Sequence, residues 1–217
     1  MSLRKQIISG DKILKDGQYE DFFENYKDVL TVKNGKLNGC SFRYFKSIKK
    51  VFFSEKIEWV LNYKDNYIDN FQHGKCFLYN HDGTVYHEWN YNHGELDGEQ
   101  YTYDYSTGRK EVTGLDTYKN GLLHGKHETW SIDKDLTTGK FVSKRLQWEG
   151  QYVEDEKDGV WYEQLWSDDI RVEKTYKNGK RHGRWNNYCN YEKVLRSVDI
   201  YDHGEKVGEE MIFDNYD

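Results

Sequence analysis

The 217-residue sequence contains no proline, and no apolar stretch in it approaches the length of a membrane span. A membrane-spanning helix needs about 20 consecutive apolar residues. The first ten residues also lack the apolar core, about 7–15 residues long, of a secretory signal peptide. Only three cysteines are present, Cys40, Cys76 and Cys189, and no Cys-x-x-Cys pair occurs. This odd count favours reduced thiols, so we expect a cytoplasmic protein.

The chain also lacks an excess of basic residues. It has 32 Lys and Arg against 38 Asp and Glu, which gives a formal net charge of −6. Nucleic acids and anionic lipid surfaces attract proteins that carry an excess of Lys and Arg. We therefore expect no nucleic-acid partner, and the charge disfavours a membrane partner, whereas a basic protein would suit it.

Motifs of common catalytic sites are absent from the sequence as well. There is no Gly-x-Ser-x-Gly elbow, no phosphate-binding Gly-Lys-Ser/Thr and no dinucleotide fingerprint. The His-Glu pairs at 87–88 and 127–128 are not followed by the second histidine of a zinc protease. Acidic pairs at 168–169 and 209–210 are sequence neighbours that lie on alternating faces or in loops. The sequence therefore predicts no catalytic residues, no cofactor and no enzymatic activity.

Aromatic residues are abundant, with 19 Tyr, 10 Phe and 7 Trp. Disordered chains are poor in aromatics, so this chain is expected to fold. With 32% charged residues, it suits a thin or elongated structure in which each layer buries little surface.

A short phrase recurs seven times: an aromatic residue, a turn dipeptide, and a second glycine four residues after the first. Clear copies are Tyr-Asn-His-Gly at 91–94 and Tyr-Lys-Asn-Gly at 118–121. The first glycine defines a reference position, which is occupied by Gly35, Asn70, Gly94, Gly121, Asp155, Gly179 and Gly204. Asn and Asp are the non-glycine residues that best tolerate positive φ. The position is therefore predicted to need a left-handed backbone, as in the tight β-hairpin turns that Asn-Gly favours.

The second glycine is present in every copy, at Gly39, Gly74, Gly98, Gly125, Gly159, Gly183 and Gly208. In the strand that follows, aromatic residues such as Phe42 and Tyr44 alternate with polar ones such as Ser41. This period of two predicts one buried aromatic face and one wet polar face. The expected fold class is all-β, an elongated antiparallel meander of about seven stacked hairpin repeats.

Successive reference positions are 24 to 35 residues apart, and the extra residues fall at 45–56 and 131–143. We expect them to be variable loops on the edge opposite the Asn-Gly turns. Residues 1–30 are less regular and are predicted to be an N-terminal capping segment, in which 19–30 forms a hairpin or a short helix. Residues 31–217 are predicted to be the repeat array.

The phrase Tyr-x-Asn-Gly-x-x-x-Gly with its aromatic strand resembles the MORN repeat over residues 30–213. The copy Tyr-Lys-Asn-Gly-Leu-Leu-His-Gly-Lys at 118–126 resembles the bacterial YwqK-type antitoxin branch most closely. The chain departs from the pattern at Asn70, Asp155, Val32 and the two insertions. The resemblance implies a non-catalytic hairpin array used for protein interaction, for scaffolding and in some members for membrane association. The antitoxin branch implies neutralisation of a toxin by binding.

Trp161 and Trp185 stand out because each lies two residues past a second glycine, on the face expected to be polar. Exposed rigid aromatics are typical interface anchors. With Arg184 as a basic neighbour, they are the predicted partner-binding residues. The alternative is that curvature or a loop covers this face and makes both tryptophans core residues.

Eight histidines raise the question of a metal site. His73, His124 and His182 occupy the same repeat position, and so do His93 and His203. Equivalent positions in successive repeats are about 10 Å apart by strand spacing, too far for zinc bonds near 2 Å. A pair of His124 with His127 suggests no third ligand. No metal is therefore expected.

The preferred functional prediction is a non-catalytic protein-binding module of antitoxin or immunity type. The alternatives are a scaffold that assembles through exposed sheet edges and, with less support from the charge, a module that docks on lipid. The sequence leaves the oligomeric state and the partner open.

Overall fold

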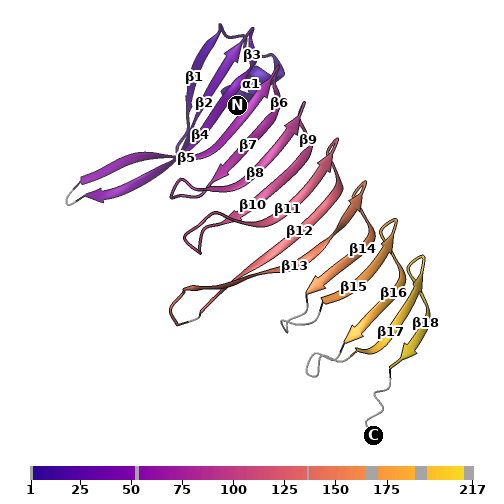
Figure 1. Ribbon diagram of the computed structural model, residues 1–217. Coiled ribbons are helices and arrows are strands. Elements are labelled where there is room, and N and C mark those ends of the chain that lie inside the picture. Colours follow the sequence, from indigo (N-terminus) through magenta and orange to yellow (C-terminus); the bar gives the residue numbers. More distant parts are fainter. Residues whose placement is uncertain (1, 52–53, 136, 165–170, 189–194, 213–217) are drawn as a thin grey trace. The chain divides into compact units, whose positions relative to one another are not determined.

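The computed structural model describes residues 2–51, 54–135, 137–164, 171–188 and 195–212. Within these residues the chain consists of strands and one short helix (Figure 1). The strands pair antiparallel with neighbours along the chain, which confirms the all-β meander of hairpin repeats. The chain divides into two compact units, residues 1–103 and 104–217, and each is described by itself. Cys189 and the acidic pair at 168–169 lie outside the described residues.

The first unit begins with the helix and contains most of the short strands. Its elements are α1 (Leu3–Ser9), β1 (Gly17–Phe22), β2 (Tyr26–Lys33), β3 (Lys36–Leu37), β4 (Gly39–Val51), β5 (Ser54–Ile68), β6 (Phe71–Gln72), β7 (Gly74–Tyr79), β8 (Val85–Asn92), β9 (Glu95–Leu96) and β10 (Gly98–Asp104). The helix is seven residues long. No helix in the described residues combines the length and the apolar character that crossing a membrane requires.

The strands of the second unit have seven to thirteen residues. They are β11 (Glu111–Lys119), β12 (Leu122–Lys134), β13 (Phe141–Val153), β14 (Glu156–Gln164), β15 (Arg171–Lys177), β16 (Lys180–Tyr188), β17 (Leu195–Asp202) and β18 (Glu205–Met211). Each strand pairs with the one that follows it along the chain.

All seven repeat turns have the backbone that the sequence predicts. The reference residue and the residue before it both have positive φ in every copy, which is the signature of a type I′ hairpin turn. At the two positions without glycine, φ is 76° for Asn70 and 68° for Asp155. The second glycine also has positive φ in all copies except Gly208.

Successive turns are joined by a repeating hydrogen bond. At five of the seven turns, the amide of the reference residue donates to a carbonyl of the preceding repeat, that of the second residue after its reference position, as from Asn70 to Leu37 at 3.0 Å. The same bond is made by Gly94, Asp155, Gly179 and Gly204. At the non-glycine positions a side chain adds a second bond: the Leu37 amide donates to Asn70 Oδ1 and the Leu123 amide to Asp155 Oδ1, both at 2.7 Å. Asn70 and Asp155 therefore keep the turn conformation and add a hydrogen bond to the turn of the preceding repeat.

The prediction of a buried aromatic face and a wet polar face is wrong. The positions two residues past the second glycine are buried, with exposed fractions of 0% for Ser41, 1% for Cys76 and 7% for Gln100, whereas Phe42 is only half-buried. Near the second glycine the ladder is interrupted, and these side chains accept hydrogen bonds from backbone amides ten residues earlier. A buried amide without a ladder partner needs such an acceptor, so polar residues occupy the inward position.

The two insertions are not variable loops. In each unit they lengthen two paired strands into a hairpin arm, and the arm of the first unit projects at the left of Figure 1. The β4–β5 ladder continues to the pair Val51 and Ser54, and the β12–β13 ladder to Lys134 and Phe141. The inserted residues satisfy their backbone groups by pairing with each other, which a long loop does not achieve.

The N-terminal segment packs a helix on the first hairpins. Residues 19–30 belong to the β1–β2 hairpin, the first of the two predicted alternatives, whereas helix α1 was not predicted. Ile7 of α1 is buried in a core with Leu30, Val32, Leu37 and Tyr67. The division into a cap of residues 1–30 and an array of residues 31–217 stays a prediction.

Charged groups anchor the same helix. Arg4 donates to Asp65 Oδ2 at 3.0 Å, and the fully buried Asp28 receives two bonds from Arg43, at 2.8 and 3.0 Å. Carboxylates are buried at low cost only when they are paired in this way.

Candidate interaction surfaces

The predicted partner-binding tryptophans lie in the interior of the second unit. Trp161 of β14 is 1% exposed and Trp185 of β16 is 9% exposed. Their indole nitrogens donate to the carbonyls of Gln151 and Thr175, each ten residues earlier, at 3.1 and 3.0 Å. These are the inward positions that Ser41 and Cys76 occupy in the first unit. The burial favours the core alternative, and a partner-binding role stays a prediction.

The tryptophans belong to a continuous aromatic ladder. Ring centroids are 4.9 Å apart from Tyr152 to Trp161, 6.2 Å from Trp161 to Tyr176, and 5.2 Å for each of the next two steps, to Trp185 and then Tyr201. All five rings meet edge-to-face or tilted, which is the arrangement that aromatic quadrupoles favour. The ladder is therefore a structural core that crosses successive hairpins.

Cationic side chains cover the faces of this ladder. Lys157 Nζ lies 4.0 Å from the Trp161 ring centroid and 5.2 Å from that of Tyr176. Burial lowers the pKa of Lys157, and the nearby positive charge of Lys174 lowers it further. Arg181 lies over Trp185 at 4.7 Å. Such cation–π contacts stabilise the rings and keep solvent from them, which explains why residues on a nominally polar face are not exposed.

The side chain of Arg184 lies on the opposite face of β16 from Trp185. Arg184 follows Gly183 and precedes Trp185, and adjacent strand residues point to opposite faces. Its guanidinium pairs bidentately with Glu210 of β18, at 2.8 and 2.7 Å. This hydrogen bonding lowers the pKa of the Glu210 carboxyl. The structure therefore does not bring the three predicted residues together into one site.

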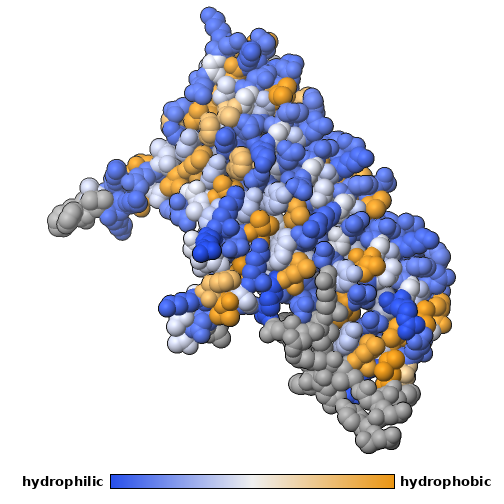
Figure 2. Space-filling model, in the orientation of Figure 1, coloured by the Kyte–Doolittle hydropathy of each residue, from blue (hydrophilic) through white to orange (hydrophobic). Residues whose placement is uncertain are grey.

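A surface that the sequence did not predict lies at the base of the first arm. Here a hollow of about 350 Å³ is lined by the apolar side chains of Phe45, Ile48, Val60, Leu61 and Tyr79, with polar residues around them. Phe45 is 46% exposed, and Ile48 is 53% exposed. Orange side chains stand at this base in Figure 2, next to the blue ones of the arm. The volume lies within the range of small ligand pockets.

A β-bulge places an amide in this hollow. Arg43 pairs with Tyr63 and Tyr44 with Leu61, so Asn62 is the extra residue between them. Bulges re-aim a side chain in this manner. The Asn62 amide nitrogen donates to the Tyr79 carbonyl at 3.4 Å, while Oδ1 is buried and accepts no hydrogen bond from the described residues. A ligand that donates a hydrogen bond to this oxygen would satisfy it.

The second arm has a related but more polar base. Its bulge residue is Gln147, which donates to Ser131 Oγ at 2.9 Å. The hollow there measures about 430 Å³. Asp133 accepts from Ser143 and pairs with Arg145 at 2.6 Å, and these bonds lower the pKa of its carboxyl. Most polar groups around this hollow bond to one another, so it offers a ligand fewer open contacts than the first.

The pairs considered for catalysis have structural partners. His87 is hydrogen-bonded to Thr102 at 3.0 Å, and burial lowers the pKa of its imidazole. His127 pairs with Asp116 at 2.6 Å, and its ring centroid lies 5.4 Å from that of Trp161, beside the aromatic ladder. Lys206 and Arg184 pair with the two carboxylates at 209–210.

Comparison with known proteins gives no family assignment. No protein-family profile and no curated protein sequence matches the chain. The resemblance to MORN repeats and to the YwqK-type branch therefore stays a prediction.

Proposed function

We propose that the chain is a non-catalytic protein-binding repeat module that neutralises a partner by binding it, in the manner of an antitoxin or immunity protein. The hollow at the base of the β4–β5 arm supports this proposal most directly. It combines exposed apolar side chains, Phe45 and Ile48, with the buried acceptor Asn62 Oδ1. An apolar side chain of the partner would fill the hollow while a neighbouring backbone amide donates to Asn62.

The arm offers a second contact surface beside the hollow. Ile48 and Ile57 face each other across the strands, and each is more than half exposed. The arm also carries Lys49 and Lys56, both of which reach Glu58, at 2.7 and 3.4 Å. Although the chain as a whole is acidic and suits a basic partner, apolar contact rather than net charge supports this site.

The proposal predicts that the hollow is needed for binding. The chain is co-expressed with the product of the neighbouring gene in its genome, and growth and complex formation by size-exclusion chromatography are measured. The double variant Phe45→Ser, Ile48→Ser is expected to lose the complex and the growth rescue, with affinity at least tenfold lower, because partly buried apolar contacts dominate binding energy.

The matched control is Val207→Ser, an apolar residue of β18 that is 63% exposed. It should bind and rescue like the wild type. Toxicity that the wild-type chain does not relieve would refute neutralisation, and a double variant that binds normally would refute the role of the hollow.

The scaffold alternative receives less support from the geometry. The last described strand, β18, carries Glu205, Lys206, Glu209 and Glu210, and charges on an edge strand hinder pairing with another sheet. Light scattering over a range of concentrations distinguishes the two proposals, since a scaffold of this kind would show a rising mass.

A further inference from the structure

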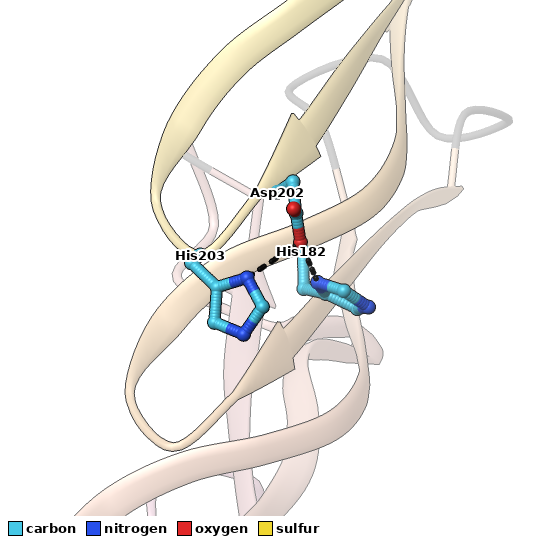
Figure 3. Close-up of side chains that lie close together, drawn as sticks. All are labelled: His182, Asp202 and His203. Carbon is cyan, nitrogen blue, oxygen red and sulfur yellow. Dashed lines mark ion pairs between the residues drawn. The ribbon is translucent and has the colours of Figure 1, made fainter.

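Three metal-ligating side chains meet where the last two described hairpins turn (Figure 3). His182 lies in β16 just before Gly183, Asp202 ends β17, and His203 begins the turn to β18. His203 Nδ1 is 2.7 Å from Asp202 Oδ1, and His182 Nδ1 is 3.4 Å from the same oxygen. One ligand atom from each residue lies within 4.8 Å of the others.

The meeting of these residues follows from the stacking of the repeats. The residue before the second glycine of one repeat contacts the residue before the reference position of the next, as Asn38 contacts Asp69 at 3.2 Å. Between successive repeats, the sequence-based comparison considered equivalent positions, which are too far apart. Histidines at two different positions of successive repeats are neighbours, and the ring centroids of His182 and His203 are 5.8 Å apart.

One ligand atom is also poorly satisfied. His182 Nδ1 is shielded from solvent and makes no hydrogen bond with the described residues, although it lies within ion-pair distance of Asp202. Shielded polar atoms of this kind destabilise the fold unless they find a partner. Imidazole nitrogen and carboxylate oxygen are the usual non-sulfur ligands of zinc.

We propose that His182, Asp202 and His203 bind a divalent first-row transition-metal ion, for which Zn²⁺ is the probe. Bonds of 2.0–2.1 Å in a tetrahedral site place ligand atoms about 3.3 Å apart. The side chains are 35%, 55% and 71% exposed, so small rotations bring them to this spacing. A water completes the coordination, and the ion ties β16 to the β17–β18 turn.

The first unit contains the same arrangement with a neutral amide. The ring centroids of His73 and His93 are 5.1 Å apart, and His93 Nδ1 lies 2.8 Å from Asn92 Oδ1. His73 Nδ1 is likewise shielded and without a hydrogen bond to the described residues. In this cluster Asn92 takes the place of the carboxylate of Asp202, and an anionic ligand binds a divalent cation more strongly than an amide does.

The test is a calorimetric titration of the metal-stripped full chain with ZnCl₂, together with the visible absorption of added Co²⁺. The wild type is expected to bind one ion per chain. His182→Asn, His203→Asn and Asp202→Asn should each weaken binding by at least about tenfold. Asparagine already occupies positions equivalent to 182 and 203, at Asn38 and Asn178, so these variants keep the turns. Melting by circular dichroism without metal confirms their folding.

Two variants in the first unit complete the test. His93→Asn should leave binding at the site of His182, Asp202 and His203 unchanged. Asn92→Asp should raise the number of bound ions per chain from one to two. Saturable binding that survives both His182→Asn and His203→Asn would overturn the proposal. The absence of saturable binding to the wild type would also overturn it and leave only an ion pair.

Discussion

Trp161 lies so close to the backbone of Gly150 that a Cβ on this glycine would meet the indole ring at 2.2 Å. Gly150 is not one of the repeat glycines, and its φ is not in the left-handed region. Its role is therefore space rather than conformation. At residue scale the sequence identified the positive φ of the reference positions, because Asn and Asp replace glycine there. It did not predict the positive φ of the second glycines, and it gave no signal that Gly150 makes room for a ring of β14.

Gly150→Ala is accordingly expected to destabilise the protein by about 3 kcal/mol, because the added methyl forces Trp161 out of its packed position. Urea unfolding followed by tryptophan fluorescence measures the change. The matched control is Gly208→Ala, where the new Cβ meets Ile200 at an ordinary 3.5 Å without positive φ. That variant should stay within about 0.5 kcal/mol of the wild type, and equal effects of the two substitutions would contradict the steric explanation.

At the scale of elements, helix α1 covers a core that the first hairpins would otherwise expose. A side-chain oxygen of Ser2 caps its first turn, and Gly10 ends it in a left-handed conformation. Two adjacent isoleucines have opposite environments, since Ile7 is 1% exposed and Ile8 is 47% exposed. The helix escaped prediction because seven residues are too few to show a helical period.

Ile7→Ala is expected to lower the free energy of unfolding by about 2–4 kcal/mol, because it leaves a cavity beside Leu30 and Val32. Ile8→Ala should cost less than about 0.5 kcal/mol. Hydrogen exchange of the β2 amides reports on the same element and should speed up only in the first variant. Similar losses from both substitutions would show that α1 does not cap the core.

The insertions illustrate what strand patterns leave undetermined. Residues 45–56 contain apolar residues, such as Ile48 and Val51, without a regular alternation, a pattern that suits a strand as well as a loop. The bulge at Asn62 and the hollow beside it depend on how two strands register, which period-two alternation does not specify. The sequence therefore predicted the positions of the glycine turns, which depend on local residues. It did not predict the candidate binding surface, which depends on strand register.

For the molecule as a whole, burial of weakly acidic neutral groups makes the fold sensitive to alkali. Burial raises the pKa of the Cys76 thiol to about 11 and that of the Tyr67 hydroxyl to about 12. Unfolded cysteine and tyrosine lose their protons near pH 8.5 and 10. The folded state holds these protons more tightly, so the stabilisation is complete below about pH 8.5 and is lost progressively as pH rises towards 12.

Urea unfolding between pH 8 and pH 11 should therefore show a falling midpoint. Cys76→Ser removes one of the two groups and copies the natural Ser41 at the equivalent position, so its midpoint should fall less steeply with pH. A decline as steep as that of the wild type would exclude the thiol as a cause.

The hydrogen bond between each turn and its predecessor has a consequence for how such a gene can lengthen. Where this bond is made, the donor and the acceptor lie at fixed offsets from the reference position, so these repeats present the same bonding groups to their neighbours. A tandem duplication of 24 or 25 codons, the spacing of the shortest repeats, would insert a hairpin whose two junctions are already complementary. The number of repeats can thus rise or fall during evolution while the hydrogen bond between successive turns is kept.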